Sequence, residues 1–467
     1  MGVNWNSLFP ENKQTQEVLI VCVLSLLALA TRAYGIWEWP IAGDEYFTNA
    51  WAEKRATGIV GSAYYALVLG SQAVFGATNW AARLPSVVLG VLSIPAFYLM
   101  CKSMFGRKAA TIGCVFIILS EWHLYHSQIA RFYSGVFLFG TISYHSYYLS
   151  LRRNRYIYLF YFFSSSIVAV SFHATAIFVV VSCATYSLLR VLDPRGGKAG
   201  LSRSMAKVHL LICVAAAVIS LPIFFDIARS WSMNPRGSSV NTLRTVLGVV
   251  ENMGFAVFVS AFLGLAYLCF ESTQKLYLFS ALIVVPLFSV FIFSVVLPPS
   301  RPRYMFYSLP VFFSLSAFFC DSLDSKIKNY VSIEAGTIIV ISSFMAIGFL
   351  SYYSGRITLD IRDPIRFVEE EYRTDDTVVV FSYSIRDYLD EGIDVDKITK
   401  PAWKGGLVPV VEKEGRTWVI VDTYRTASLR RDLEAWLMEN ASLKWRKKET
   451  RFDYTQRGYE VWLEDDQ

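Results

Sequence analysis

Residues 17–37, EVLIVCVLSLLALATRAYGIW, decide the fold, and they are followed almost at once by WPIAGDEYFTNAW at 39–51. About 20 mainly apolar residues suffice for a helix to cross a bilayer. The run lacks a small-residue cleavage site and more apolar runs follow it, so we expect a retained helix rather than a signal peptide. The sequence thus predicts a membrane helix that ends in an acidic loop.

The composition agrees with a membrane protein. Of the 467 residues, 54% are hydrophobic and only 18% are charged, whereas a soluble domain carries about a quarter of its residues as charge. These values exclude disordered, collagen-like and small disulfide-rich chains. All seven cysteines precede residue 351 and none forms a CxxC pair, so neither a disulfide framework nor a thiolate metal motif is expected.

The charged residues are unevenly distributed along the chain. Residues 1–351 hold 25 Lys/Arg and 14 Asp/Glu, and residues 352–467 hold 19 and 24. This change predicts a transmembrane domain at 1–351 and a soluble domain at 352–467. The net charge of +6 averages a basic membrane part with an acidic tail, and it indicates no nucleic-acid partner.

The membrane part contains about eleven candidate transmembrane helices. Lys and Arg gather in alternate loops, which predicts a cytoplasmic N-terminus and an extracytoplasmic C-terminal domain in the cell (inner) membrane. A further run, 57–78, is Gly-rich and would invert this alternation, so we expect it to form surface helices in the first outer loop, 38–83. The eleven runs lie near 17–37, 84–101, 109–122, 133–151, 156–172, 174–191, 208–225, 253–270, 276–297, 304–320 and 330–351.

The tail shows the alternation of a small α/β domain. We expect helices at 363–372 and 427–440 and strands at 377–382, 417–422 and 459–463. It carries no obvious sugar-binding signature.

Several outer segments carry more polar chemistry than a surface loop needs. Asp44 and Glu45 are adjacent, which favours either a solvated loop or a carboxylate that acts as a base above the membrane. Arginines at outer helix ends either anchor helices at lipid headgroups or bind a phosphate. His173 is either a satisfied helix-end histidine or part of a site. Arg32 needs a partner inside the membrane, for which Asp44 or Glu45 is a candidate.

These segments together resemble the GT-C glycosyltransferases, in the branch of protein O-mannosyltransferases and lipid A aminoarabinose transferases. The similar segments are GDEY, AYYALVLGSQAVFGATNWAARLPS, HSQIARFYS, SFHATA and RPRYMFYSLP, in this order over roughly residues 20–310. Each motif is weak alone, but their order and spacing are specific.

The resemblance implies an integral-membrane glycosyltransferase of the cell envelope. It would move a hexosyl or pentosyl group from a polyprenyl-phosphate donor to an extracytoplasmic glycan, lipid or protein, with inversion and with Asp44 as the base. Glu45 would support Asp44. The residues expected to hold the donor phosphate are Arg131, Arg303, Arg301 and Arg83, and those expected to contact substrate are Tyr64, Tyr65, His126, Gln128, Tyr133, His173 and Tyr304.

The sequence departs from the family pattern at Ile129, where many relatives carry an acid. Any role of that acid is either absent or supplied by Glu121, which argues against a divalent metal, and no cofactor is predicted. Two other interpretations remain: a transporter or lipid flippase, and a non-catalytic membrane scaffold. The first is disfavoured because the sequence shows no paired halves with broken helices.

Overall fold

The chain forms two compact units in a computed structural model. One comprises residues 1–36 and 51–350, and the other comprises residues 37–50 and 351–467. The structure describes residues 12–39, 45, 48, 52, 53, 56, 61–193, 203–233, 242–295, 301–326, 331–358, 362–381, 394–396, 416–422, 430–451 and 455–464.

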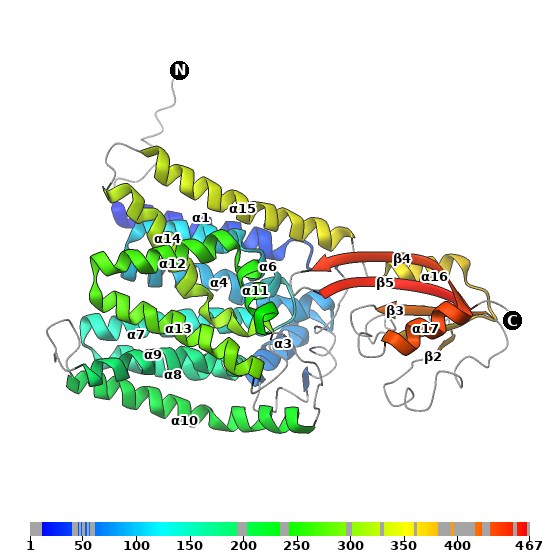
Figure 1. Cartoon of the computed structure of the whole chain (residues 1–467), viewed down its shortest axis with the longest axis horizontal. Helices are drawn as coiled ribbons and strands as arrows, with labels where there is room; N and C mark the ends of the chain where they lie inside the picture. Colours follow the sequence, from blue (N-terminus) through cyan, green and yellow to red (C-terminus); the bar gives the residue numbers. More distant parts are fainter. Residues whose placement is uncertain are drawn as a thin grey trace, which may run out of the picture. The chain divides into compact units, whose positions relative to one another are not determined.

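The first unit is a bundle of helices, many of which run side by side (Figure 1). Each of the eleven apolar runs of the sequence overlaps a described helix. The helices are α1 Lys13–Ala33, α3 Ser62–Phe75, α4 Asn79–Phe105, α5 Arg107–Leu119, α6 Glu121–Gln128, α7 Tyr133–Arg153, α8 Tyr156–Phe172, η2 Ala174–Ala176, α9 Ile177–Leu192, α10 Arg203–Met233, α11 Thr242–Met253, α12 Phe255–Glu271, α13 Thr273–Val295, η3 Pro302–Ser308, α14 Leu309–Lys326 and α15 Val331–Thr358.

The length and apolar composition of the helices are those of a multi-pass membrane protein. Among the described residues, seven helices are long and apolar enough to cross a bilayer. An eighth is reached if α11 and α12, which meet at an angle of 91°, count as one broken span. The bend is at Gly254, whose φ of +90° favours glycine. The expected count of eleven spans therefore stays a prediction.

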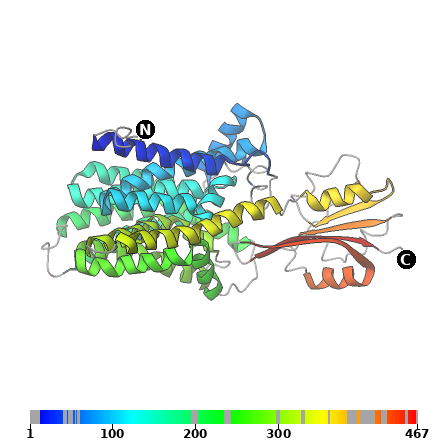
Figure 2. The same cartoon turned by 90° about the horizontal axis from the view of Figure 1, so that it is seen from above.

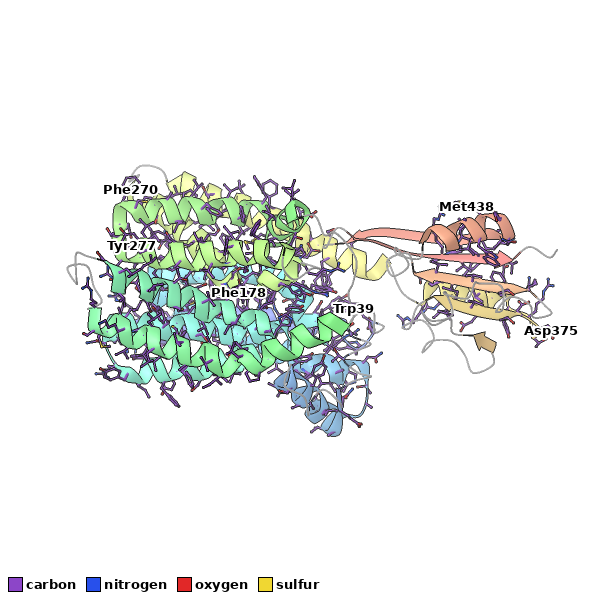
Figure 3. The ribbon with its side chains drawn as sticks, turned by 60° about the horizontal axis from the view of Figure 1, so that its bottom comes forward. Trp39, Phe178, Phe270, Tyr277, Asp375 and Met438 are labelled. Carbon is purple, nitrogen blue, oxygen red and sulfur yellow. The ribbon has the colours of Figure 1, made fainter. Side chains whose placement is uncertain are left out.

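The outer helices present apolar side chains to their surroundings. In the spanning windows of α1 and α15 only 17% of the residues are buried inside the protein, which suits helices that face lipid. Phe270, 81% exposed at the end of α12, projects from the edge of the bundle (Figure 3). Inside the bundle, α12 lies so close to α14 that a Cβ on Gly264 would meet the carbonyl oxygen of Leu315 at 2.3 Å.

The short helix α3 lies within the expected surface segment 57–78. Figure 2 shows it inclined to the long helices at one end of the bundle. It packs against α4 and α8 through Tyr64, Tyr65 and Val68, all buried. Residues 57–60 lie outside the described residues, and the position of α3 relative to the membrane stays a prediction.

The second unit is built on a five-stranded mixed sheet of order β2-β1-β3-β5-β4. Strand β1 pairs in parallel with β2 and β3, whereas β5 pairs antiparallel with β3 and β4. The helices α16 and α17 cover opposite faces (Figure 2). The elements are α16 Asp363–Glu371, β1 Thr377–Phe381, β2 Asp394–Asp396, β3 Thr417–Asp422, α17 Arg430–Asn440, β4 Ala441–Arg451 and β5 Thr455–Glu464.

The predicted α/β character of the tail is confirmed, with two strands missed. The expected helices correspond to α16 and α17, and the expected strands to β1, β3 and β5. Strand β4 was missed because the apolar alternation of its sequence, ASLKWRKKETR, is limited to Ala441, Leu443 and Trp445 and is followed by mainly charged residues.

The early segment of the second unit packs against its later residues. The Trp39 ring meets Tyr352 edge-on, with centroids 6.5 Å apart, and lies 6.2 Å from Tyr353. Arg362 donates from Nη2 to the Glu38 carbonyl oxygen at 3.4 Å. The unit is therefore assembled from two distant parts of the sequence.

Candidate functional site

His173 is the centre of a polar and aromatic cluster in the first unit. It caps η2, because its Nδ1 accepts from the backbone N–H of Thr175 at 3.3 Å and lies 2.8 Å from Thr175 Oγ1. This assigns the ring proton to Nε2. The ring stacks against Phe132 at 4.7 Å and Tyr304 at 5.8 Å between centroids.

Two arginines lie near enough to His173 to lower the pKa of its imidazole. Burial lowers the pKa of His173, and the guanidinium groups of Arg131 and Arg303 lower it further, to about 3. The imidazole is therefore neutral near pH 7. Two arginines from separate segments thus act on one uncharged ring.

Arg131 is held in place by its surroundings. Its Cζ lies 4.6 Å from the centre of the Phe132 ring. Its carbonyl oxygen accepts from Ser86 Oγ at 2.9 Å, and the same hydroxyl lies 2.8 Å from the Tyr64 hydroxyl. Tyr64 therefore fixes the backbone at Arg131, and a direct substrate contact by Tyr64 or Tyr65 stays a prediction.

A wall of aromatic rings adjoins His173. The Tyr133 ring lies 5.5 Å from His173 and 4.5 Å from His126. His126 also meets Phe306 at 4.8 Å. Both His126 and Tyr133 are 2% exposed, so they shape the cluster from within.

Three further polar residues tie helix ends together. Arg32 is fully buried and donates to the carbonyl oxygen of Ile117 at 2.9 Å, with its other Nη 3.3 Å from that of Ile118. These carbonyls end α5, so Arg32 caps that helix.

Gln128 donates to Thr31 O at 2.9 Å, and buried Arg83 donates to Ile36 O at 2.9 Å. These contacts give both residues structural roles at the end of α1, and phosphate binding by Arg83 stays a prediction. Arg301 caps η3 beside Arg303, with its carbonyl accepting from Tyr304 N at 3.0 Å.

The two acids of the first loop are less fully described. Asp44 lies outside the described residues. Glu45 is 2% exposed and belongs to the second unit. Their roles stay predictions.

Glu121, the first residue of α6, packs closely on α15. Its Oε2 would lie 2.9 Å from a Cβ on Gly348. The described part of the chain contains no group of three His, Cys, Asp or Glu placed to hold a metal. A role for Glu121 in place of the acid missing at Ile129 stays a prediction.

The residues that support Arg131 and His173 have no signal of their own in the sequence. Phe132, Ser86 and Thr175 position Arg131 and His173 but carry no charge that would single them out. The segments RFYS and SFHATA contained two of them, and only the fold shows that Phe132 and Tyr304 lie on the same histidine.

Comparison with solved structures identifies the fold. Over 96% of this chain and 98% of the other, it is similar to ArnT from Cupriavidus metallidurans solved with undecaprenyl phosphate, with TM-score 0.54 and 12% identity. Over 91% of this chain and 71% of the other, it is similar to the oligosaccharyltransferase of Archaeoglobus fulgidus, with TM-score 0.58 and 11% identity.

A further structure of the archaeal protein, AglB in complex with an inhibitory peptide and a dolichol-phosphate, gives TM-score 0.56 and 11% identity over 96% of this chain and 74% of the other. No protein-family model and no curated protein sequence matches the chain. The expected GT-C fold is confirmed by these structural similarities.

Proposed function

We propose that the chain is an integral-membrane glycosyltransferase that moves a sugar from a polyprenyl-phosphate donor to an extracytoplasmic acceptor. The observation that carries the proposal is the pair Arg131 and Arg303 acting on neutral His173 beside stacked aromatic rings. A lipid phosphate needs cations near the membrane surface, and guanidinium groups fork two hydrogen bonds to phosphate oxygens.

The fold supports the same donor class. ArnT was solved with undecaprenyl phosphate and AglB with a dolichol-phosphate and a peptide. Both ligands share a long isoprenoid tail and a phosphate, which is the chemistry that the arginine pair suits. Carried to this chain, they favour a donor whose tail lies among lipid-facing helices.

The chemical step requires an acceptor hydroxyl or amine to lose a proton. We assign this role to Asp44, with Glu45 in support, because GDEY follows the first membrane helix directly. Attack on the anomeric carbon opposite the departing phosphate would invert its configuration.

The first test identifies the donor. Cells that lack the protein should accumulate a lipid-linked sugar, and its mass gives the sugar and the lipid. Purified protein in detergent should then consume that extracted lipid when acceptor is added. A flippase would move no sugar in detergent, where there are no compartments, so an absence of turnover would contradict the proposal.

The second test concerns the base. Asp44→Asn should lower turnover by about 10²–10⁴-fold, the usual contribution of a general base, while donor binding stays near normal. Glu38→Gln, the same change of charge in an exposed acid six residues earlier, is the control and should keep its activity. Near-normal turnover in Asp44→Asn would remove Asp44 from this role.

A further inference from the structure

An open cavity in the second unit lies between α16 and the edge strand β4. It has a volume of about 420 Å³, within the range of roughly 300–1,000 Å³ typical of small-molecule sites. Its lining consists of two aromatic residues and four charged ones: Asp363, Arg366, Phe367, Glu370, Trp445 and Arg446.

Trp445 reaches this cavity because β4 contains an irregularity. Leu443 pairs with Trp462, but Trp445 pairs with Val461, so Lys444 is an extra residue in β4. Trp462 packs in the apolar cluster on the α17 face, and Val461 packs in the cluster on the α16 face. Without the bulge, Trp445 would fall on the α17 face, since side chains alternate along a strand. Bulges often re-aim a side chain next to a functional site.

The redirected Trp445 forms an aromatic platform. Its ring lies 6.4 Å from that of Phe367, with 28° between the ring planes. Phe367 in turn meets buried Trp418 nearly edge-on at 6.3 Å. Phe367 is thereby fixed by the core, and Trp445 is partly accessible beside it.

The charged side chains beside the platform come from α16: Asp363, Arg366 and Glu370. Arg366 Nη1 lies 3.9 Å from Asp363 Oδ1. Arg446 follows Trp445 directly and donates from Nε to Glu460 Oε1 at 3.0 Å, so its side chain lies on the α17 face. Two acids and one arginine offer both hydrogen-bond acceptors and donors. Such a lining disfavours a phosphate, which the acids repel, and a lipid tail, which cannot satisfy charged groups.

A sugar ring matches this combination. One face of a pyranose carries C–H groups that pack on an aromatic ring, and its edge carries hydroxyls that both donate and accept. We infer that this cavity binds a sugar residue of a glycan by stacking it on Trp445. Building on the proposed function, the bound residue would belong to the glycan acceptor.

Direct binding to the full-length protein in detergent tests the inference without requiring catalysis. The probes are maltotriose, mannotriose and chitotriose, followed by saturation-transfer NMR, with triglycine as a non-sugar control. At least one trisaccharide should receive saturation from the wild-type protein. Trp445→Ala should weaken that binding by about tenfold or more.

Two variants separate the cavity from general effects on folding. Trp436→Ala removes a similarly half-buried tryptophan packed on the α17-face cluster and should leave binding unchanged. Glu370→Gln changes an exposed cavity acid without touching the core and should weaken binding. Saturation of none of the three sugars, equal saturation of triglycine, or full binding in both Trp445→Ala and Glu370→Gln would overturn the inference. Sugar binding without any transfer would instead count against the proposed glycosyltransferase function alone.

Discussion

Arg131 and Arg303 both lower the pKa of His173. The contribution of each arginine to donor binding can be measured by replacing it alone. Replacing either with Ala should weaken binding of undecaprenyl phosphate by about two to four orders of magnitude, since breaking one buried charge pair costs about 3–5 kcal/mol. Arg→Lys should recover only part of the loss, because Lys lacks the planar two-point contact. Affinity measured on purified variants decides the matter.

Arg152 provides the matched control for this experiment. It is an exposed arginine that meets the Tyr148 ring at 6.0 Å, so Arg152→Ala should keep full donor affinity. If Arg131 and Arg303 only anchored helices at headgroups, Lys would serve nearly as well as Arg, and the Ala variants would lose yield rather than affinity.

The pKa of His173 gives a second prediction at the residue scale. Burial and two cations hold the pKa near 3, well below the unfolded value. Its contribution to stability is therefore full above about pH 6.5 and is lost as the pH falls toward the folded pKa. Bound phosphate or loss of Arg131 should raise this pKa, because either change removes positive charge from the neighbourhood.

The measurement is NMR of protein labelled at its five histidines. The His173 signal, assigned from His173→Asn, should titrate at lower pH than an unperturbed histidine, and its midpoint should move upward with undecaprenyl phosphate or in Arg131→Ala. A titration midpoint that is unchanged both by undecaprenyl phosphate and in Arg131→Ala would contradict the proposed phosphate position.

Charge and ring chemistry single out Arg131, Arg303 and His173 in the sequence, and both arginines act on His173 in the structure, while their roles stay predictions. The sequence does not show where a side chain acts through a neighbour. Gln128 reads as a substrate ligand in its motif, yet its amide donates to the carbonyl of Thr31. A motif gives the order of side chains along the chain but not the direction in which each one points.

At the scale of elements, the approach of α12 to α14 sets a testable limit on size. In Gly264→Ala the new Cβ would meet the Leu315 carbonyl at 2.3 Å, and backbone cannot move aside as a flexible side chain can. We expect a loss of about 1–3 kcal/mol, as for other overpacked sites, seen as a lower melting temperature in detergent.

Gly336→Ala is the control for this prediction. A Cβ at Gly336 would meet nothing within 4 Å, so the variant should be neutral or up to about 1 kcal/mol more stable from helix propensity. Equal melting temperatures for the two variants would show that α12 and α14 can move apart without a loss of stability.

Apolar runs located the helices well, as in α4 and α12, because the runs 84–101 and 253–270 contain no charged residue. They failed for β4, in which charged residues outnumber apolar ones, and the number of spans stays a prediction. Helix α8 is only 17 residues long, so length alone leaves its membrane crossing open.

At the scale of the whole molecule, the alternation of basic loops predicts that the C-terminal unit is extracytoplasmic. Met438, 68% exposed on α17 (Figure 3), is a suitable position for a cysteine. In intact cells Met438→Cys should react with a membrane-impermeant maleimide, whereas Arg155→Cys, in a predicted cytoplasmic loop, should react only after lysis. The reverse pattern would overturn the orientation and favour a span at 57–78.

The two-part construction of the second unit has a consequence for biosynthesis. Glu38 and its partner Arg362 lie 324 residues apart in the chain. At about 5–20 residues per second of synthesis, roughly 15–65 s pass between the emergence of the first and of the second. Throughout that interval the Trp39 side chain has neither Tyr352 nor Tyr353 to pack against. The ribosome therefore synthesises the early segment of the second unit before most of the helical bundle. The second unit can complete its packing only after its later residues have emerged.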